Sequence, residues 1–280
     1  MSNPLISIVI PSYNSERYIR ECLESLRTAK SDRVECILVD GGSSDNTMSI
    51  VEDYRELFSV IISEQDEGQS DAFNKGFNLA KGEYFTWLNS DDVFCPGALS
   101  LVLKRIELRD SEWYAANVVY LDEHSRITRC CQSGSFEEWA LPFGILNVFG
   151  PSTVFSRKLY EELGGFREDF HYCMDTEYWW RIARSGIRYK RIPVYLWALR
   201  LHKAAKTAAV VTQGPSARPP RMVEENERYR QMYFPYISDR NRTRGVWLVR
   251  FWRVLNLSYL RSHMRTLRYR GKLISSMKNS

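Results

Sequence analysis

Two hydrophobic patterns alternate along the N-terminal third of the chain. Continuous apolar runs rich in β-branched residues have the length of buried strands, and they lie at residues 5–11, 34–40, 59–64 and 83–89. Between them are segments with apolar positions three and four residues apart, which predict helices over residues 15–29, 44–57 and 70–82. Strands that alternate with helices of this length form βαβ units, so the pattern predicts an α/β fold with a mostly parallel sheet flanked by helices.

The remainder of the chain has a less regular pattern. It predicts a strand over 113–121, an extended apolar segment over 188–202, and helices over 96–107, 156–166 and 175–186. Small residues, glycine and proline predict a loop over 203–220, whereas residues 245–272 are amphipathic and predict one long helix. We expect one domain over residues 1–222, made of the halves 1–95 and 96–222, followed by a basic, aromatic, helical extension over 223–280.

Charge is divided between the body and the tail. Residues 240–280 contain eleven Lys or Arg and no Asp or Glu, which leaves the first 239 residues with 28 basic and 34 acidic side chains. The body is therefore mildly acidic, although the whole chain has a formal net charge of +5.

Other features favour a cytoplasmic location. The first residues lack the basic start and the small-residue cleavage site of a signal peptide, and the longest uncharged run, residues 139–156, is too interrupted by Pro and Gly for a spanning helix. The six cysteines show no CxxC spacing, and they fit a reducing compartment in which they serve as small buried apolar groups.

Two adjacent carboxylates, Asp91 and Asp92, follow the fourth predicted strand. Ligands bind beyond the carboxyl ends of parallel strands, where Asp40 and Asp66 are also expected. Two neighbouring anions repel each other unless a cation or a donor lies close by, and Mg²⁺ or Mn²⁺ uses one or two carboxylates together with water and substrate phosphates. The alternative is a polar turn in which Asp91 caps the next helix.

Four segments, taken in order, carry a resemblance to a known family. They are "SIVIPSYN", "LVDGGSSDNT", "DAFNKGFNLAKGEYFTWLNSDD" and "GGFREDFHYCMDTEYWWRIARSG". The ordered set resembles the inverting glycosyltransferases of family 2, over roughly residues 5–203. The resemblance implies the GT-A fold, with a nucleotide-binding half over 1–95 and an acceptor half over 96–222.

The resemblance also implies roles for residues near the donor. Asp40 would accept the imide N–H of a uracil ring, since a carboxylate is an acceptor only. Asp92 would hold a Mn²⁺ or Mg²⁺ ion on the diphosphate, and Asp91 would lie near the ribose or the sugar. The other implied donor-binding positions are Pro11, Tyr13, Asn14, Asp66, Asn74 and Lys75.

Asp175 matches the catalytic base of the family. The start of a helix favours a carboxylate there, which could take the acceptor hydroxyl proton, although a capping role would leave the same pattern. Glu177 is the alternative base and ranks second, and Asp169 in the preceding loop is expected to be structural or to face the acceptor. His202 matches a position that reaches the metal or diphosphate, but a lone histidine is also common at the surface or in the core. Arg200 and Lys206 are further candidates for contact with phosphate.

Some features of the sequence depart from the family pattern or exclude other enzymes. The usual Asp-x-Asp triplet is replaced by Asn89-Ser90-Asp91-Asp92. The Gln/Arg-rich signature of processive synthases is missing, and no GxGxxG follows the first strand, which disfavours a dinucleotide dehydrogenase.

The basic tail leaves two hypotheses of equal weight. A helix over 245–272 would place Arg250, Arg253, Arg261, Arg265, Arg268 and Lys272 near one face, and Leu248, Trp252, Leu255 and Tyr259 on another. Such a helix fits contact with an anionic membrane, or it packs its apolar face on the body. Nucleic-acid binding is disfavoured because no recognised module accompanies the charge.

The resemblance and the residues together predict a metal-dependent, inverting glycosyltransferase. It would move one sugar from a UDP-sugar to a hydroxyl of a glycan or lipid-linked acceptor in the synthesis of a surface polysaccharide. One alternative is a non-catalytic relative that binds nucleotide or scaffolds a partner. The other is a sugar-phosphate nucleotidyltransferase, which should carry a Gly-rich basic loop after the first strand, where this chain has "PSYNSERY".

Overall fold

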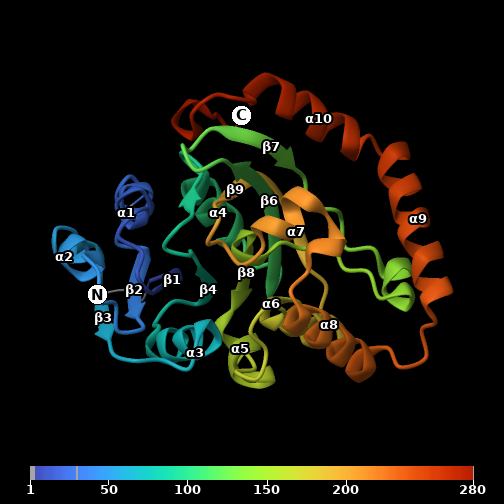
Figure 1. The fold of residues 1–280 in the computed structure, drawn as a ribbon, viewed down its shortest axis with the longest axis horizontal. Helices are drawn as coiled ribbons and strands as arrows, with labels where there is room; N and C mark the ends of the chain where they lie inside the picture. The colour runs from blue at the N-terminus through green and yellow to red at the C-terminus, as the bar shows by residue number, and fades with distance from the viewer. Residues whose placement is uncertain (1–3, 30, 280) are drawn as a thin grey trace.

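The computed structural model describes residues 4–29 and 31–279, and the strands of these residues form one sheet with helices on both faces (Figure 1). The sheet order is β3-β2-β1-β4-β8-β6-β9-β5, with β7 paired to β6. The strands are β1 (Ile6–Ser12), β2 (Val34–Asp40), β3 (Val60–Ser63), β4 (Tyr84–Trp87), β5 (Val93–Phe94), β6 (Trp113–Leu121), β7 (Ile127–Cys131), β8 (Thr153–Ser156) and β9 (Lys190–Arg200).

Ten α-helices lie within the described residues. They are α1 (Ile19–Arg27), α2 (Thr47–Glu52), α3 (Gln69–Leu79), α4 (Ala98–Ile106), α5 (Arg157–Leu163), α6 (Met174–Arg184), α7 (Ala208–Gln213), α8 (Pro220–Tyr233), α9 (Asp239–Leu255) and α10 (Ser258–Tyr269). Short 3₁₀ turns are η1 (Arg55–Leu57), η2 (Glu138–Phe143), η3 (Gly150–Ser152), η4 (Pro215–Ala217) and η5 (Ile274–Ser276).

The N-terminal half confirms the predicted parallel βαβ arrangement. Strands β3, β2, β1 and β4 are parallel neighbours, with Ile8 of β1 opposite Cys36 on one side and Thr86 on the other. Their carboxyl ends therefore meet at one edge of the sheet, where the polar residues of the sequence motifs follow them.

Apolar side chains fill both faces of this sheet. Helix α1 contributes Ile19, Cys22, Leu23 and Leu26 to the core on one face. On the other face, α3 packs so closely on β1 that a Cβ at Gly76 would lie 2.5 Å from the side chain of Val9. Glycine at this position thus sets the distance between α3 and the sheet.

The second half completes the sheet with mixed strand directions. Strand β8 is antiparallel to β4 and β6, β9 is parallel to β6, and β5 runs antiparallel to the distal part of β9. The β5 pairing, with Val93 opposite Ala198, brings residues just before β5 next to those just after β9. This antiparallel pairing therefore brings Asp91 and Asp92 close to the residues that follow β9.

Two predictions for the C-terminal region are wrong. Residues 203–220, expected as a loop, contain α7 and η4. The long helix expected over 245–272 is broken into α9 and α10, because Leu257 adopts a left-handed conformation with φ of 59°. The Asn256 side chain accepts hydrogen bonds from the Ser258 N–H and hydroxyl, which offers the backbone an alternative to continuing the helix.

The C-terminal helices run along the outside of the molecule (Figure 1). Helix α10 lies on β7, where the Cys130 N–H donates to Thr266 Oγ1 at 2.9 Å, and α9 lies beside η2. The expected boundary after residue 222 falls inside α8, and the division into those domains stays a prediction. Among the residues that the structure describes, no helix combines the length and the apolar composition needed to cross a bilayer.

Candidate active site

A cavity of about 820 Å³ opens at the carboxyl edge of β1 and β4. Most of its lining comes from five segments: residues 11–15 at the end of β1, 66–69 at the start of α3, 89–92 after β4, 171–175 at the start of α6, and 202–207 after β9. These segments are far apart in the sequence, and the sheet order brings them together at one edge.

Of the eleven residues assigned from the sequence to the donor, the metal or the role of base, eight line this cavity and three do not. Those in the cavity are Pro11, Tyr13, Asn14, Asp66, Asp91, Asp92, Asp175 and His202. Asp40, Asn74 and Lys75 lie outside it.

Asp91 and His202 form a pair that faces the cavity. The Asp91 Oδ2 and His202 Nε2 atoms are 2.9 Å apart, and about a third of the Asp91 side chain remains exposed. The His202 ring lies 4.8 Å from the Tyr18 ring, measured between centroids, which holds it beside the carboxylate. His202 thus lies beside a carboxylate at the cavity, and its contact with a metal or diphosphate stays a prediction.

Asp92 has the opposite surroundings. It is fully buried, and its Oδ2 accepts hydrogen bonds from Trp197 Nε1 at 2.8 Å and Asn89 Nδ2 at 2.9 Å. Its Oδ1 accepts from the Arg200 N–H at 2.8 Å. Burial, together with the neighbouring Asp91, raises the pKa of Asp92 well above its ordinary value. Both Asp92 oxygens thus accept hydrogen bonds from other groups of the chain, whereas the sequence predicted that Asp92 would bind the metal ion.

The alternative of a helix-capping Asp91 does not match the structure. Residues 91 and 92 lead into β5, and the next helix, α4, begins at Ala98 with Gly97 at its N-cap. The structure therefore leaves the Asp91 carboxylate free of a capping role.

The Asp91–His202 pair fits a hard divalent cation whose coordination is completed by substrate. No cluster of three or more His, Cys, Asp or Glu suited to hold a metal ion occurs within residues 4–29 and 31–279. Mg²⁺ in nucleotide sites uses only one or two carboxylates, with waters and phosphate oxygens as the remaining ligands. Asp91 and His202 could therefore supply two ligands, and water and the substrate phosphates in the cavity could supply the others.

Asp40 organises the loop after β2. Its side chain is fully buried, and its oxygens accept hydrogen bonds from the N–H groups of Gly42 and Ser43 and the hydroxyls of Ser43 and Ser63. Four donors of the chain thus occupy the carboxylate that was expected to accept a uracil N–H.

Asp66 does reach the cavity. Its Oδ1 accepts the Gly68 N–H at 2.9 Å, while a Cβ at Gly41 would lie 2.6 Å from its Oδ2. Gly41 therefore leaves room for the Asp66 carboxylate to lie against the loop that Asp40 shapes.

Tyr13 and Asn14 form the rim of the cavity after β1. The Tyr13 side chain is 65% exposed, and Asn14 has a positive φ of 45°, a conformation that Asn tolerates better than most residues. Asn14 Oδ1 accepts the Ser44 N–H at 2.9 Å, so the two loops that follow β1 and β2 are tied together.

Asn74 and Lys75 connect structural elements outside the cavity. Asn74 exchanges two hydrogen bonds of 2.8 Å with the backbone of Phe166, which ties α3 to the loop before α6. Lys75 pairs with Glu64 at 2.9 Å and with Asp71 at 3.1 Å.

Asp175 lies in the first turn of α6 and points into the cavity. Its Oδ1 accepts the Thr176 N–H at 2.6 Å, while its Oδ2 lies 3.2 Å from where a Cβ at Gly150 would be. Burial raises the pKa of the Asp175 carboxyl above its ordinary value. Cys173, not Asp175, occupies the N-cap position, so the carboxylate is available for chemistry.

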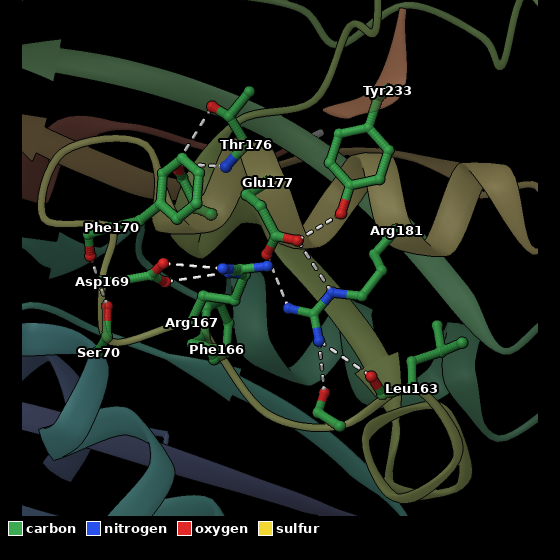
Figure 2. A network of polar contacts seen from close by, with 12 residues as sticks. Ser70, Leu163, Phe166, Arg167, Asp169, Phe170, Thr176, Glu177, Arg181 and Tyr233 are labelled. Atoms are coloured by element: carbon green, nitrogen blue, oxygen red, sulfur yellow. Dashed lines mark hydrogen bonds and ion pairs between the residues drawn. The ribbon is translucent and has the colours of Figure 1, made fainter. Parts of the chain in front are cut away.

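The alternative base, Glu177, is committed to a structural network (Figure 2). It is fully buried, forms an ion pair of 2.7 Å with Arg181, and accepts a hydrogen bond of 2.5 Å from the Tyr233 hydroxyl. Asp169, also drawn there, pairs with Arg167 at 2.8 Å. Neither carboxylate lines the cavity.

Arg200 and Lys206 have different surroundings. Arg200 is buried, with Nε donating to the Asp91 carbonyl at 2.8 Å and Nη2 to Glu21 at 2.7 Å, so it supports the Asp91 backbone. Lys206 lines the cavity, where Nζ donates to Gln69 Oε1 at 3.3 Å and to the His171 carbonyl at 3.4 Å.

Sequence reasoning missed two contributors to this region, His171 and Glu225. His171 lines the cavity, and Glu225 of α8 binds the backbone of the same loop. No motif marks Glu225, because its partners are main-chain N–H groups that are more than fifty residues away in the sequence.

Comparison with known proteins places these features in a family. The family described as "Glycosyl transferase family 2" matches residues 7–164, more than half of the chain. An uncharacterized glycosyltransferase of Rickettsia prowazekii is 29% identical over 220 residues, which cover 75% of this chain and 68% of that protein.

Two solved structures have a similar fold. Staphylococcus aureus TarS 1–349, in complex with UDP-GlcNAc, has a TM-score of 0.58 and 20% identity, covering 71% of this chain and 59% of its own. The Pyrobaculum calidifontis mannosyltransferase, in complex with GDP-Man and Mn²⁺, has a TM-score of 0.57 and 18% identity, covering 95% and 88%. On the family match and this shared architecture, the chain belongs to glycosyl transferase family 2 and is a glycosyltransferase of the GT-A fold.

Proposed function

We propose that the protein transfers one sugar from a UDP-sugar to a hydroxyl of a glycan or lipid-linked acceptor, with inversion at the anomeric carbon, in the synthesis of a surface polysaccharide. The main support for this proposal is that the Asp91–His202 pair and the Asp175 carboxylate line the same cavity at the carboxyl edge of the sheet.

The donor would lie between the loops after β1 and β4. Tyr13 offers an exposed ring to the base, and Asn14 and Asp66 offer polar atoms to the base and ribose. Binding of UDP-GlcNAc by TarS supports a UDP-sugar, whereas GDP-Man in the Pyrobaculum enzyme makes GDP the first competitor to test. A direct contact of Asp40, Asn74 or Lys75 with the nucleotide stays a prediction.

Asp91 and His202 would hold the divalent cation, and Mn²⁺ in the Pyrobaculum enzyme supports this choice of group. We propose that Asp92 supports Asp91 without binding the ion itself. Its hydrogen bonds with Trp197 and Arg200 fix the backbone at the point where Asp91 turns toward the cavity. When bound, the ion would neutralise charge on the diphosphate that leaves.

Asp175 would act as the general base. Its Oδ2 would take the proton of the acceptor hydroxyl as that oxygen attacks the anomeric carbon and the bond to UDP breaks. The raised pKa makes the ionised Asp175 a stronger base than an exposed aspartate. Attack from the face opposite the diphosphate inverts the configuration.

Turnover of Asp175→Asn tests this assignment. The side chain keeps its size but loses the ability to accept a proton, so nucleotide release from UDP-sugars should fall about 10²–10⁴-fold while UDP still binds. Asp53→Asn, at an exposed aspartate paired with Arg20, is the matched control and should keep wild-type turnover. An Asp175→Asn protein as active as wild type would rule out Asp175 as the base, whereas a wild-type chain that binds UDP but turns over no UDP-sugar would favour the non-catalytic alternative.

We also propose that the C-terminal helices hold the enzyme at an anionic membrane, where a lipid-linked acceptor would be found. The apolar positions expected to pack on the body, Leu248, Trp252, Leu255 and Tyr259, are each more than 40% exposed. The side chains of α9 and α10 that are buried are instead Val249 and Tyr269.

The exposed apolar side chains of these helices form what we call the outer stripe. Its members are Trp247, Leu248, Phe251, Trp252, Val254 and Leu255 of α9, Leu257 between the helices, and Tyr259, Leu260, Met264 and Leu267 of α10, and many of them lie three or four residues apart. Eleven basic residues and no acidic ones in 240–280 favour an anionic lipid surface over a second copy of the chain, which would bring like charges together.

A further inference from the structure

Helix α8 carries a buried carboxylate that binds the chain just before the proposed base. Glu225 is only 3% exposed, and its oxygens accept the N–H groups of His171 at 2.8 Å, Tyr172 at 2.7 Å and Cys173 at 3.0 Å. Asp175 follows two residues after the last of these amides.

The physical chemistry of this contact makes it restrictive. Hydrogen bonds from N–H groups to an ionised carboxylate are shorter and about twice as strong as neutral ones, and here three consecutive donors converge on one group. The donors lie at the N-terminus of α6, where the partial positive charge of the helix also favours an anion. The backbone of residues 171–173 is therefore held in one conformation.

Other side chains of α8 extend the contact to both sides of Asp175. Arg228 pairs with Asp169 at 2.5 Å, and Asn226 Nδ2 donates to the Cys173 sulfur at 3.3 Å. Beyond Asp175, the Tyr233 hydroxyl donates to Glu177 (Figure 2). Glu225 is the member of this set that holds main-chain groups of the cavity wall itself.

We propose that Glu225 is a positioning residue for sugar transfer: by fixing the amides of residues 171–173, it orients Asp175 toward the acceptor. This inference rests on the proposed role of Asp175 as the base. Asp66 and the proposed metal ligands come from other elements, since Asp66 precedes α3, Asp91 follows β4 and His202 follows β9, and the segment held by Glu225 contacts the phosphate candidate Lys206 through the His171 carbonyl at 3.4 Å. Loss of the Glu225 charge should therefore slow transfer without weakening the binding of UDP.

The test uses Glu225→Gln in the full chain, with Glu224→Gln as the control at the exposed neighbouring position. An amide replaces one acceptor oxygen by an NH₂ group, which cannot accept the N–H groups that point at it. We expect kcat for UDP release from UDP-GlcNAc to fall about 100-fold, the cost of displacing a catalytic group by about 1 Å. The Kd of UDP measured with Mn²⁺ should stay at the wild-type value, and Glu224→Gln should match wild type in both.

Hydrogen exchange gives a readout that does not depend on turnover. The amides of His171, Tyr172 and Cys173 should exchange faster in Glu225→Gln, and those of β1 should not change. If Glu225→Gln does not fold, Glu225→Asp, which withdraws the carboxylate by one methylene, should show the same loss of kcat and of amide protection to a smaller extent.

Two results would overturn the inference. One is wild-type kcat and wild-type amide protection in a folded Glu225 variant. The other is a rise in the Kd of UDP that accounts for the whole loss of kcat/KM. The Asp175→Asn variant distinguishes failure of this inference from failure of the proposed function. Wild-type turnover in Asp175→Asn would show that Asp175 is not the base. An inactive Asp175→Asn together with a fully active Glu225→Gln would disprove only the positioning role of Glu225.

Discussion

Asp91 and Asp92 show how strongly the surroundings of a residue decide its chemistry. The two residues lie in the turn between β4 and β5, which is closed by the Asp92 N–H donating to the Asn89 carbonyl at 3.0 Å. Their side chains reach different partners, since one carboxylate meets His202 at the cavity and the other meets Trp197 in the interior. Three N–H donors satisfy Asp92 and leave Asp91 as the member of the pair that is open to a ligand. Burial and the repulsion by Asp91 together raise the pKa of Asp92 well above its ordinary value.

The titration of Asp175 predicts the acidic limb of the pH–rate profile. Burial disfavours the ionised carboxylate and raises its pKa above the ordinary value of 3.8. Only the ionised form can accept a proton, so kcat should fall as the pH is lowered through this raised pKa. The midpoint of the fall should lie clearly above that of an exposed aspartate.

The pH dependence of kcat at saturating UDP-sugar measures this midpoint. At each pH, kcat is taken at concentrations of UDP-sugar and Mn²⁺ that saturate the enzyme, because protonation of the proposed metal ligands weakens metal binding as the pH falls. An acidic limb at the ordinary aspartate value would argue against a buried base.

At the scale of elements, the outer stripe of α9 and α10 predicts membrane binding through apolar insertion. Replacing Phe251, Leu260 and Met264 together by Gln removes three exposed apolar side chains without touching Val249 or Tyr269, which pack inward. Flotation with vesicles that contain phosphatidylserine should fall strongly, because each buried apolar side chain contributes about 1.5–3 kcal/mol. Helical content should not change.

Leu108→Gln is the matched control for that experiment. Leu108 is 65% exposed but lies beyond α4, outside the outer stripe, so its loss should not alter flotation. Binding to neutral vesicles should be weak for the wild-type chain, because the basic side chains need anionic lipid. Flotation of the triple variant at the wild-type level would contradict the proposal, and a concentration-dependent dimer that the triple variant abolishes would point to a second copy instead.

Elements governed by local pattern could be predicted from the sequence, and those governed by distant contacts could not. The apolar run Ile6–Ser12 and the spacing of Ile19, Leu23 and Leu26 specify a buried strand and an amphipathic helix by themselves. The break at Leu257 could not be predicted, because the pattern of apolar positions continues through it. Its cause is a local hydrogen bond from Ser258 to Asn256 that competes with the helix.

At the scale of the whole molecule, the sequence indicated the edge of the sheet that carries the site but not the partners of each side chain. The family resemblance implied that Asp91, Asp175 and His202 would serve one site, and all three line the same cavity. The burial of Asp40 and Asp92 depends on donors from Ser63 and Trp197, which no spacing reveals. Glu225 went unnoticed for the same reason.

The two halves of the sheet have different parts in the proposed site. The parallel half of the sheet supports the donor loops, and the mixed half with α6 supports Asp175. The C-terminal segment contributes twice, through Glu225 beneath the cavity wall and through the outer stripe on the surface. We therefore expect the C-terminal helices to be part of the working enzyme and not only an attachment to it.

The most direct measurement is isothermal titration of UDP into the full chain, with and without Mn²⁺, with GDP and dTDP as comparisons and Asp91→Asn and Asp53→Asn as paired variants. We expect UDP to bind tightly only with Mn²⁺. Asp91→Asn should lose the Mn²⁺-dependent part of the affinity, and Asp53→Asn, at an exposed surface aspartate, should retain it. Mn²⁺-independent binding, or full affinity in Asp91→Asn, would contradict the proposed donor site.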